Sequence, residues 1–161
     1  MRRLLVVALA LVVVPTATAA FSVTLNSTSP QTFAGITLSG VDQTKTLNLS
    51  VTVVNTGGTN TTGWSVTAAA GVPTSGANTL SPLTITTVSA ATCTGGGCNQ
   101  PTNTVTWPQT LVTGGVKIFN AAAGTGKGTD VLTPTIQITY DAKALPGTYT
   151  ATLTMAGTQS P

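Results

Sequence analysis

The clearest pattern in the chain is an alternation of apolar and polar residues near its C-terminal end. In the segment 145–157, a tyrosine, an alanine, a leucine and a methionine share one parity, and threonines stand between them. Successive side chains of a β-strand point to opposite faces, so this period of two predicts a half-buried strand. The segment 133–140 alternates in the same way. Because only residues 141–147 separate the two segments, we expect them to pair as antiparallel neighbours.

The same alternation recurs upstream and predicts further strands. It is clearest in 45–54, where leucines and valines take one parity and polar residues the other. The Gly- and Asn-rich segment 55–63 has the composition of a hairpin connection, and the Gly-rich segment 121–130 is expected to be the most flexible stretch of the second half. No segment after the N-terminal one has a convincing helical period. The chain is therefore expected to be all-β, an antiparallel β-sandwich of Ig-like type. Shorter strands are predicted at 21–25, 33–39, 64–68, 80–88, 104–107 and 116–119.

The N-terminal segment differs from the rest because its apolar run is unbroken. Two arginines precede the run 4–14, and the small residues that follow include an A-x-A site at 17–19. These features are typical of a secretory signal peptide. The run is about 11 residues long, too short for a membrane-spanning helix, and no later segment approaches the length of a membrane span. We therefore expect a signal peptide at 1–20, export, and a single β-sandwich domain at 21–161.

Removal of the signal peptide would change the charge of the chain. The formal net charge of the whole sequence is +3, whereas residues 21–161 keep four lysines against three aspartates, a net charge of +1, and no arginine. Proteins that bind nucleic acids gather Lys and Arg on one face. The mature chain has no such cluster, so a nucleic-acid partner is not expected.

The composition of the mature chain also argues against catalysis. It has no histidine, glutamate or arginine, so a Ser-His-Asp triad is impossible. Proton transfer would rest on Asp, Lys and Tyr side chains, and no pair of carboxylates suits glycoside hydrolysis. A Ser-Lys or Thr-Lys dyad is compatible with the composition, although no spacing suggests one. We expect a protein that is not an enzyme and uses no cofactor.

Two cysteines, Cys93 and Cys98, are separated by one threonine and three glycines. After export they would meet an oxidising environment, and the glycine-rich spacer can bend enough to join them. We predict a disulfide within a loop at 93–101. A metal-binding pair is the alternative, but the chain has no further Cys or His to complete such a site.

Four aromatic residues are candidates for sugar binding, because a flat ring suits the apolar face of a sugar. The alternative is that they are core residues with a polar group to satisfy. Tyr140 and Tyr149 are in phase with the inward aliphatic residues of their strands, which favours the core for both. Trp107, next to Pro108 at the end of a predicted strand, is the better surface candidate. The candidate contacts with wall polymer or glycan are Trp64, Trp107 and Tyr149.

Two motifs resemble those of the WxL-domain family of secreted cell-surface proteins. The family carries a W-x-L motif in mid-domain, and here Trp64 is followed by Val66 at the leucine position. A second family motif, Y-x-x-x-x-T-W-x-L, lies near the C-terminus. Tyr149 and Thr154 match it, whereas Met155 stands at its tryptophan position and a glycine at its leucine position. The Gly-rich stretch before the last two predicted strands is also similar.

This resemblance implies a non-catalytic, β-rich domain held non-covalently on a Gram-positive cell wall through peptidoglycan. We therefore expect a secreted protein of the cell surface whose partners are wall polymer or other surface proteins. Two alternatives stay open. One is a structural subunit of an extracellular filament or surface array, in which uncovered edge strands pair between copies. The other is a carbohydrate-binding module that uses exposed aromatic rings.

Overall fold

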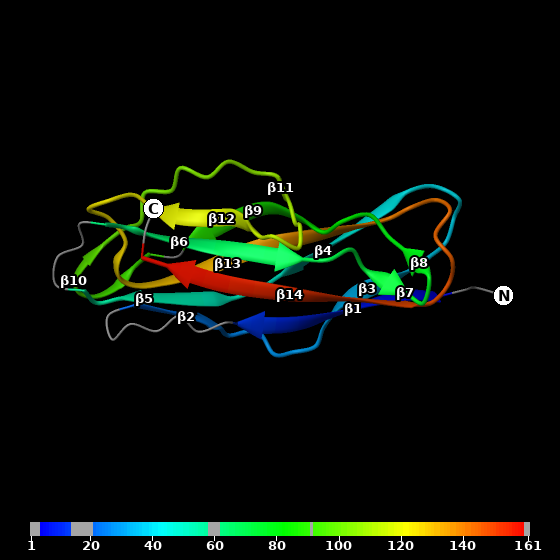
Figure 1. Ribbon diagram of the computed structural model, residues 1–161, viewed down its shortest axis with the longest axis horizontal. Coiled ribbons are helices and arrows are strands. Elements are labelled where there is room, and N and C mark those ends of the chain that lie inside the picture. The colour runs from blue at the N-terminus through cyan, green and yellow to red at the C-terminus, as the bar shows by residue number, and fades with distance from the viewer. Residues whose placement is uncertain (1–3, 14–20, 58–61, 91, 160–161) are drawn as a thin grey trace.

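The computed structural model describes residues 4–13, 21–57, 62–90 and 92–159. Every regular element in these ranges is a β-strand. The strands form two sheets that pack face to face in an elongated sandwich (Figure 1). The predicted fold class, an all-β sandwich, is therefore confirmed.

The first sheet has the strand order β12-β6-β14-β1-β3. Two short strands extend it, because β7 pairs with β14 and β8 pairs with β7. Its strands are β1 (Leu4–Val13), β3 (Gln31–Thr37), β6 (Trp64–Ala70), β7 (Thr74–Ser75), β8 (Asn78–Thr79), β12 (Val116–Ala121) and β14 (Thr148–Thr158).

The second sheet has the order β11-β9-β13-β5-β2, and β4 and β10 also pair with the long strand β13. Strand β13 is the centre of this sheet, with β9 and β10 along one edge and β4 and β5 along the other. Its strands are β2 (Phe21–Leu25), β4 (Gln43–Asn48), β5 (Val51–Asn55), β9 (Thr84–Ala90), β10 (Thr94–Asn99), β11 (Gln109–Thr110) and β13 (Lys127–Tyr140).

The core lies between the two sheets and follows the alternation that the sequence predicts. In β14, four residues of one parity point inward, and the threonines between them are exposed or half-buried. The inward residues are Tyr149, Ala151, Leu153 and Met155, with exposed fractions of 1%, 8%, 1% and 1%. Strand β13 alternates over its whole length.

Two predicted pairings were wrong. Strands β13 and β14 are not antiparallel neighbours, since β13 belongs to the second sheet and β14 to the first. The segment 55–63 is not a hairpin connection, because it also joins strands of different sheets, β5 and β6. In both cases the connection is long enough to cross from one sheet to the other. Each strand buries its apolar face in the core whether the connection crosses between the sheets or forms a hairpin within one of them.

Three smaller expectations also need correction. The predicted strand at 45–54 is divided into β4 and β5, because residues 49–50 belong to neither strand. Residues 104–107 form no strand; the short strand β11 follows them at Gln109–Thr110 instead. The Gly-rich segment 121–130 is not a free connection along its whole length, because its last four residues begin β13. Their pairing with β5 and β10 fixes the backbone there.

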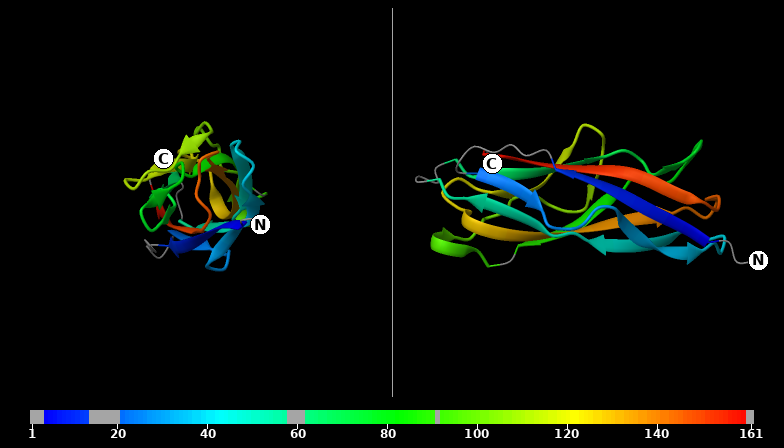
Figure 2. Two further views of the ribbon diagram at one scale, coloured as in Figure 1. Left: turned by 90° about the vertical axis from the view of Figure 1, so that its right-hand side faces the viewer. Right: turned by 90° about the horizontal axis from the view of Figure 1, so that it is seen from below.

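The segment predicted to be the apolar part of a signal peptide forms the strand β1, in the interior of the first sheet. The right-hand view of Figure 2 shows β1, in dark blue, running beside the orange and red β14. The predicted cleavage site at 17–19 lies outside the described residues. The signal peptide itself stays a prediction.

Candidate functional site at the disulfide end

One end of the sandwich is closed by the disulfide loop. Cys93 and Cys98 are joined, with their Cα atoms 6.1 Å apart, so the predicted disulfide is confirmed. The predicted loop at 93–101 is, however, largely a strand, since β10 occupies Thr94–Asn99. Strand β10 pairs with the start of β13 at Thr94↔Thr129 and Asn99↔Lys127. The disulfide therefore fixes a short strand at the edge of the second sheet.

We expect that removing this disulfide weakens the protein without unfolding it. A loop this short constrains the unfolded chain only modestly, which corresponds to about 2 kcal/mol in the chain-entropy model. The double variant Cys93→Ala/Cys98→Ala should show that loss in chemical denaturation. A reducing agent should destabilise the wild type by the same amount and leave the double variant unchanged. If the double variant does not fold, the disulfide stabilises more of the protein than strand β10.

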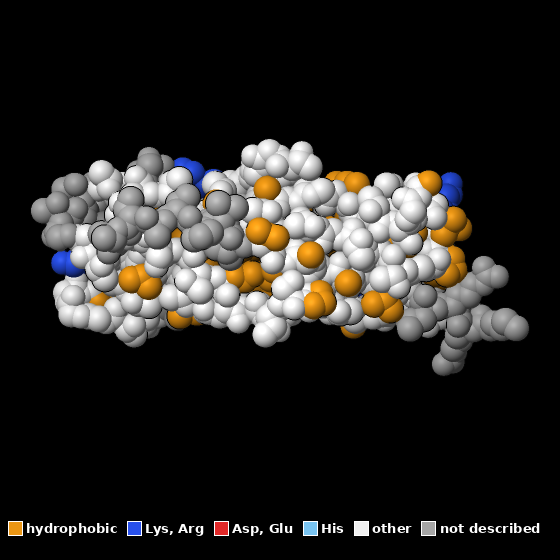
Figure 3. Space-filling model, turned by 60° about the horizontal axis from the view of Figure 1, so that its bottom comes forward, with side chains coloured by type: hydrophobic (Ala, Val, Ile, Leu, Met, Phe, Trp, Pro, Cys, Tyr) orange, Lys and Arg blue, Asp and Glu red, His pale blue; other side chains and the backbone are white. Residues whose placement is uncertain are grey.

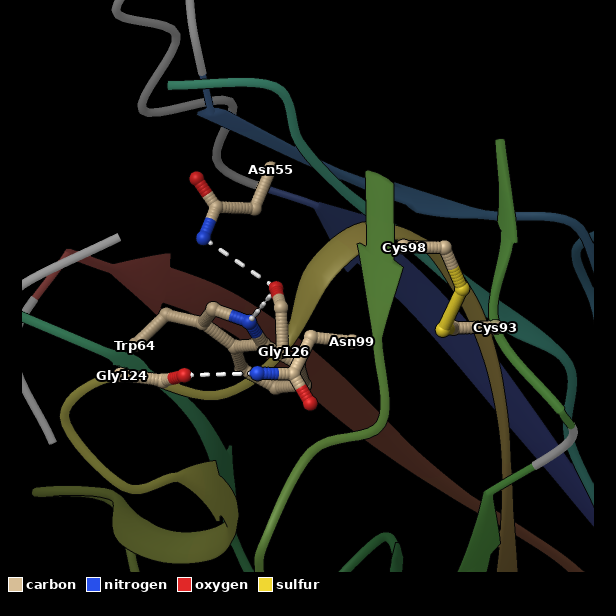
Figure 4. Close-up of a disulfide and its surroundings, with 7 residues drawn as sticks. All are labelled: Asn55, Trp64, Cys93, Cys98, Asn99, Gly124 and Gly126. Carbon is tan, nitrogen blue, oxygen red and sulfur yellow. Dashed lines mark hydrogen bonds between the residues drawn. A yellow bond between two sulfur atoms is a disulfide. The ribbon is translucent and has the colours of Figure 1, made fainter. Parts of the chain in front are cut away.

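The Gly-rich segment before β13 is tied to this end by hydrogen bonds. The Asn99 side-chain amide donates to the Gly124 carbonyl oxygen at 2.7 Å. The Thr102 backbone N–H donates to the Thr125 Oγ1 atom at 3.0 Å. These bonds join β10 and the chain that follows it to the Gly-rich turn. Figure 4 shows the bond between Asn99 and Gly124.

Trp64, a candidate for polymer contact, is instead at the centre of this packing. Its side chain is 0% exposed, and its indole N–H donates to the Gly126 carbonyl oxygen at 2.8 Å. The Asn55 side-chain amide donates to the same oxygen at 3.2 Å (Figure 4). A polymer that touched the indole ring would have to open the sandwich first. In this fold Trp64 joins the first sheet to the turn that begins β13.

Trp107 is half-buried and continues an aromatic stack. Its ring is 6.4 Å from that of Phe119, with an angle of 22° between the planes, and Phe119 is in turn 5.8 Å from Trp64. The Trp107 indole N–H donates to the Ile118 carbonyl oxygen at 2.9 Å. Only the outer side of this one ring is available to a ligand, so the structure offers no broad aromatic platform among its described residues.

The two tyrosines are core residues, as their phase in the sequence favours. Tyr149 is 1% exposed, and its hydroxyl donates to the Leu145 carbonyl oxygen at 3.0 Å. Tyr140 is fully buried, and its hydroxyl donates to the Ala34 carbonyl oxygen at 3.4 Å. Burial raises the pKa of Tyr140 to about 12. The structure therefore brings Trp64 and Trp107 together through Phe119 and gives Tyr149 a separate structural role.

A polar cavity opens beside the disulfide strand, and no pattern in the sequence indicates it. We call it the Lys127 cavity; its volume is about 260 Å³. Hydroxyl and amide groups, glycine backbone and one ammonium group surround it, so it suits a polar, uncharged or anionic group of a larger molecule. Its lining consists of Asn55, Thr56, Thr94, Gly95, Gly96, Lys127, Gly128 and Thr129.

One carboxylate, that of Asp130, lies in the core near this end. Asp130 is 0% exposed, and neither of its carboxylate oxygens has a hydrogen-bond partner among the described residues. Desolvation by burial raises its pKa from 3.8 to about 6. A carboxylate held in a core without a donor destabilises the fold when it is charged.

The other two carboxylates have structural roles. Asp42 accepts a hydrogen bond from the Ala142 backbone N–H at 2.6 Å, and Asp141 accepts one from the Ser81 hydroxyl at 3.0 Å. Among the described residues, no three His, Cys, Asp or Glu side chains gather where they could hold a metal ion. The part of the chain that the structure describes also contains no helix long and apolar enough to cross a membrane.

No family model matches the chain. No curated protein matches it either.

Proposed function

We propose that the mature chain is a secreted, non-catalytic protein of the cell surface that binds wall polymer, with peptidoglycan as the leading candidate, or other surface proteins. The observation that carries this proposal is the Lys127 cavity. It presents hydroxyl, amide and ammonium groups at one end of a rigid sandwich, whereas the aromatic rings are mostly engaged in packing. Peptidoglycan is rich in hydroxyl, amide and carboxylate groups, which such a cavity can hydrogen-bond.

The face of the molecule in Figure 3 is consistent with binding through a local site. It shows small, separated hydrophobic groups on a mostly uncharged background, with a few separate groups of lysine atoms. Neither a large apolar patch nor a charged patch is visible on that face. The sequence resemblance to WxL-domain proteins points to the same class of partner.

Replacing Lys127 by glutamine is expected to weaken binding to purified peptidoglycan about tenfold, because the loss of one charge-assisted hydrogen bond has roughly that effect. Co-sedimentation of the exported protein with peptidoglycan measures it. Lys143→Gln is the matched control, since this exposed lysine lies on the connection between β13 and β14, away from the cavity. Equal pelleting of both variants and the wild type would remove the cavity from the proposal, and no pelleting at all would remove wall polymer as the partner.

A second candidate function, a structural subunit of an extracellular assembly, is favoured by a different observation. The strand β1, whose sequence has the features predicted for an export signal, lies inside a sheet. Its removal on export would therefore leave a position in the sheet that a strand of another copy can fill.

A further inference from the structure

The position of β1 defines a slot in the first sheet, between β14 and β3. Strand β1 pairs in parallel with β14, from Val6↔Thr148 to Val13↔Met155. On its other side it pairs antiparallel with β3, from Leu4↔Thr37 to Leu9↔Gln31. We call this place the β1 slot. Among the strands that the structure describes, the β1–β14 pair alone is parallel.

The strand in the slot is part of the core. Leu5, Val7 and Leu9 are each 0% exposed. Strand β3 depends on it entirely, because β1 is the only described strand with which β3 pairs. Yet β3 contributes Phe33 and Ile36 to the core, at 1% and 4% exposed. A sandwich without a strand in this slot would lose three core side chains and both of the flanking ladders.

Cleavage at the predicted site would empty this slot. The cut would separate β1 from the mature chain and open the edge of β14 that faces β1, along the eight positions from Thr148 to Met155. The other edge of β14 would keep its pairing with β6 and β7. Open sheet edges with apolar residues below them readily accept another strand. After such a cleavage the exported protein would have an open strand position where residues 4–13 lie in the full chain.

We propose that the β1 slot of the exported protein is filled by β2 of a second copy of the same chain. This inference rests on the secretion part of the proposed function, since it needs removal of residues 1–20, and it does not depend on wall binding. Each copy would give one strand and accept one. Such a head-to-tail contact does not close on itself unless the rotation happens to form a ring, so it builds an open filament.

Strand β2 is the suitable donor for three reasons. After cleavage it is the N-terminal strand, so it can leave without threading through the fold. It is also an edge strand, paired with β5 alone among the described strands. Finally, Phe21, Val23 and Leu25 repeat the spacing of the three buried residues of β1. In the slot, β2 would pair with a neighbouring strand on both of its edges, whereas it now pairs only with β5.

The register of the slot makes this testable with cysteine pairs. If Val23 takes the place of Val7, Thr24 takes that of Ala8, which is paired with Thr150. Thr24 and Thr150 are both exposed and belong to different sheets, so a short thiol cross-linker should join cysteines at these positions only between copies. Within one chain, Thr24 is instead paired with Thr52. The pair Thr24→Cys with Thr52→Cys is therefore the control for a β2 that stays in place.

The experiment uses the full gene in an exporting host, with the N-terminus of the product read by mass spectrometry. A mixture of Thr24→Cys and Thr150→Cys proteins is expected to give intermolecular cross-links and oligomers in light scattering. The full chain, made without export, should stay monomeric and cross-link only in the Thr24→Cys/Thr52→Cys variant. A synthetic peptide of residues 4–13 should shorten the oligomers of the exported protein by occupying the slot.

Three results would overturn the proposal. The first is an exported protein that keeps residues 1–20, and the second is one that retains the excised leader peptide in a monomer. The third is a cleaved monomer that cross-links only in the Thr24→Cys/Thr52→Cys variant, which would mean that β3 closes onto β14. No peptidoglycan is present in these measurements, so their outcome is independent of the co-sedimentation result.

Discussion

Replacing Gly126 by alanine is expected to destabilise the protein by roughly 4 kcal/mol. Gly126 has a φ of +70°, where an alanine is strained by about 1 to 2 kcal/mol. A Cβ atom there would also overlap the Trp64 Nε1 atom and the Ala121 Cβ atom. Trp64 is fully buried, so its ring cannot move aside without disturbing the core and breaking its bond to the Gly126 carbonyl. Overpacking and the lost hydrogen bond add about 2 to 3 kcal/mol.

Gly124→Ala is the matched control for this substitution. Gly124 has a φ of +81°, so an alanine meets the same kind of backbone strain, but nothing lies within 4 Å of its Cβ position. The control should lose only about 1 to 2 kcal/mol. Urea denaturation followed by tryptophan fluorescence gives both values and reports the environment of the indole rings. Equal losses in the two variants would show that the Trp64 contact does not limit the space at this turn.

The local part of the fold could be predicted from the sequence because burial within a strand depends on parity alone. The alternation of β14 placed Tyr149 and Met155 inward, and both are buried. Parity also predicts the burial of one carboxylate. Asp130 shares its parity with Ile136 and Ile138 on β13, and it is buried with them.

The pairing of strands could not be predicted in this way. The connections at 55–63 and 141–147 can either form hairpins or cross between sheets, and both arrangements bury the same faces. The role of the N-terminal run was ambiguous for a similar reason. An unbroken apolar run of this length is typical of an export signal and also of a strand in the interior of a sheet.

The candidate site could not be predicted from the sequence because its residues come from distant positions in the chain. The Gly126 carbonyl lies 62 residues from Trp64, and its second donor, Asn55, lies 71 residues away. The Lys127 cavity forms only where β13 meets β5 and β10. Residue types such as Asn, Thr and Gly are common throughout this chain, so no local pattern marks those that line the cavity.

Asp130 is expected to make the wild-type protein more stable in weak acid than at neutral pH. Its pKa in the folded protein is about 6, against an ordinary 3.8. Between these values the folded chain holds a proton that the unfolded chain has released. The free energy of unfolding should therefore rise as the pH falls from about 7 to about 4, by on the order of 2 kcal/mol, and level off below the ordinary pKa.

The variant Asp130→Asn should abolish most of this dependence. It keeps the shape of the side chain and removes the charge, so the variant should be similar to the wild type at pH 4 and more stable than it at pH 7.5 by about 2 kcal/mol. Urea denaturation at a series of pH values measures both curves. Asp42→Asn removes the same charge from an exposed residue between β3 and β4 and controls for the change in net charge, because the amide oxygen of asparagine can still accept the hydrogen bond from the Ala142 N–H. If the wild-type curve is flat between pH 4.5 and 7.5, the carboxylate is stabilised in the folded protein by a donor or by solvent, and its burial does not limit stability.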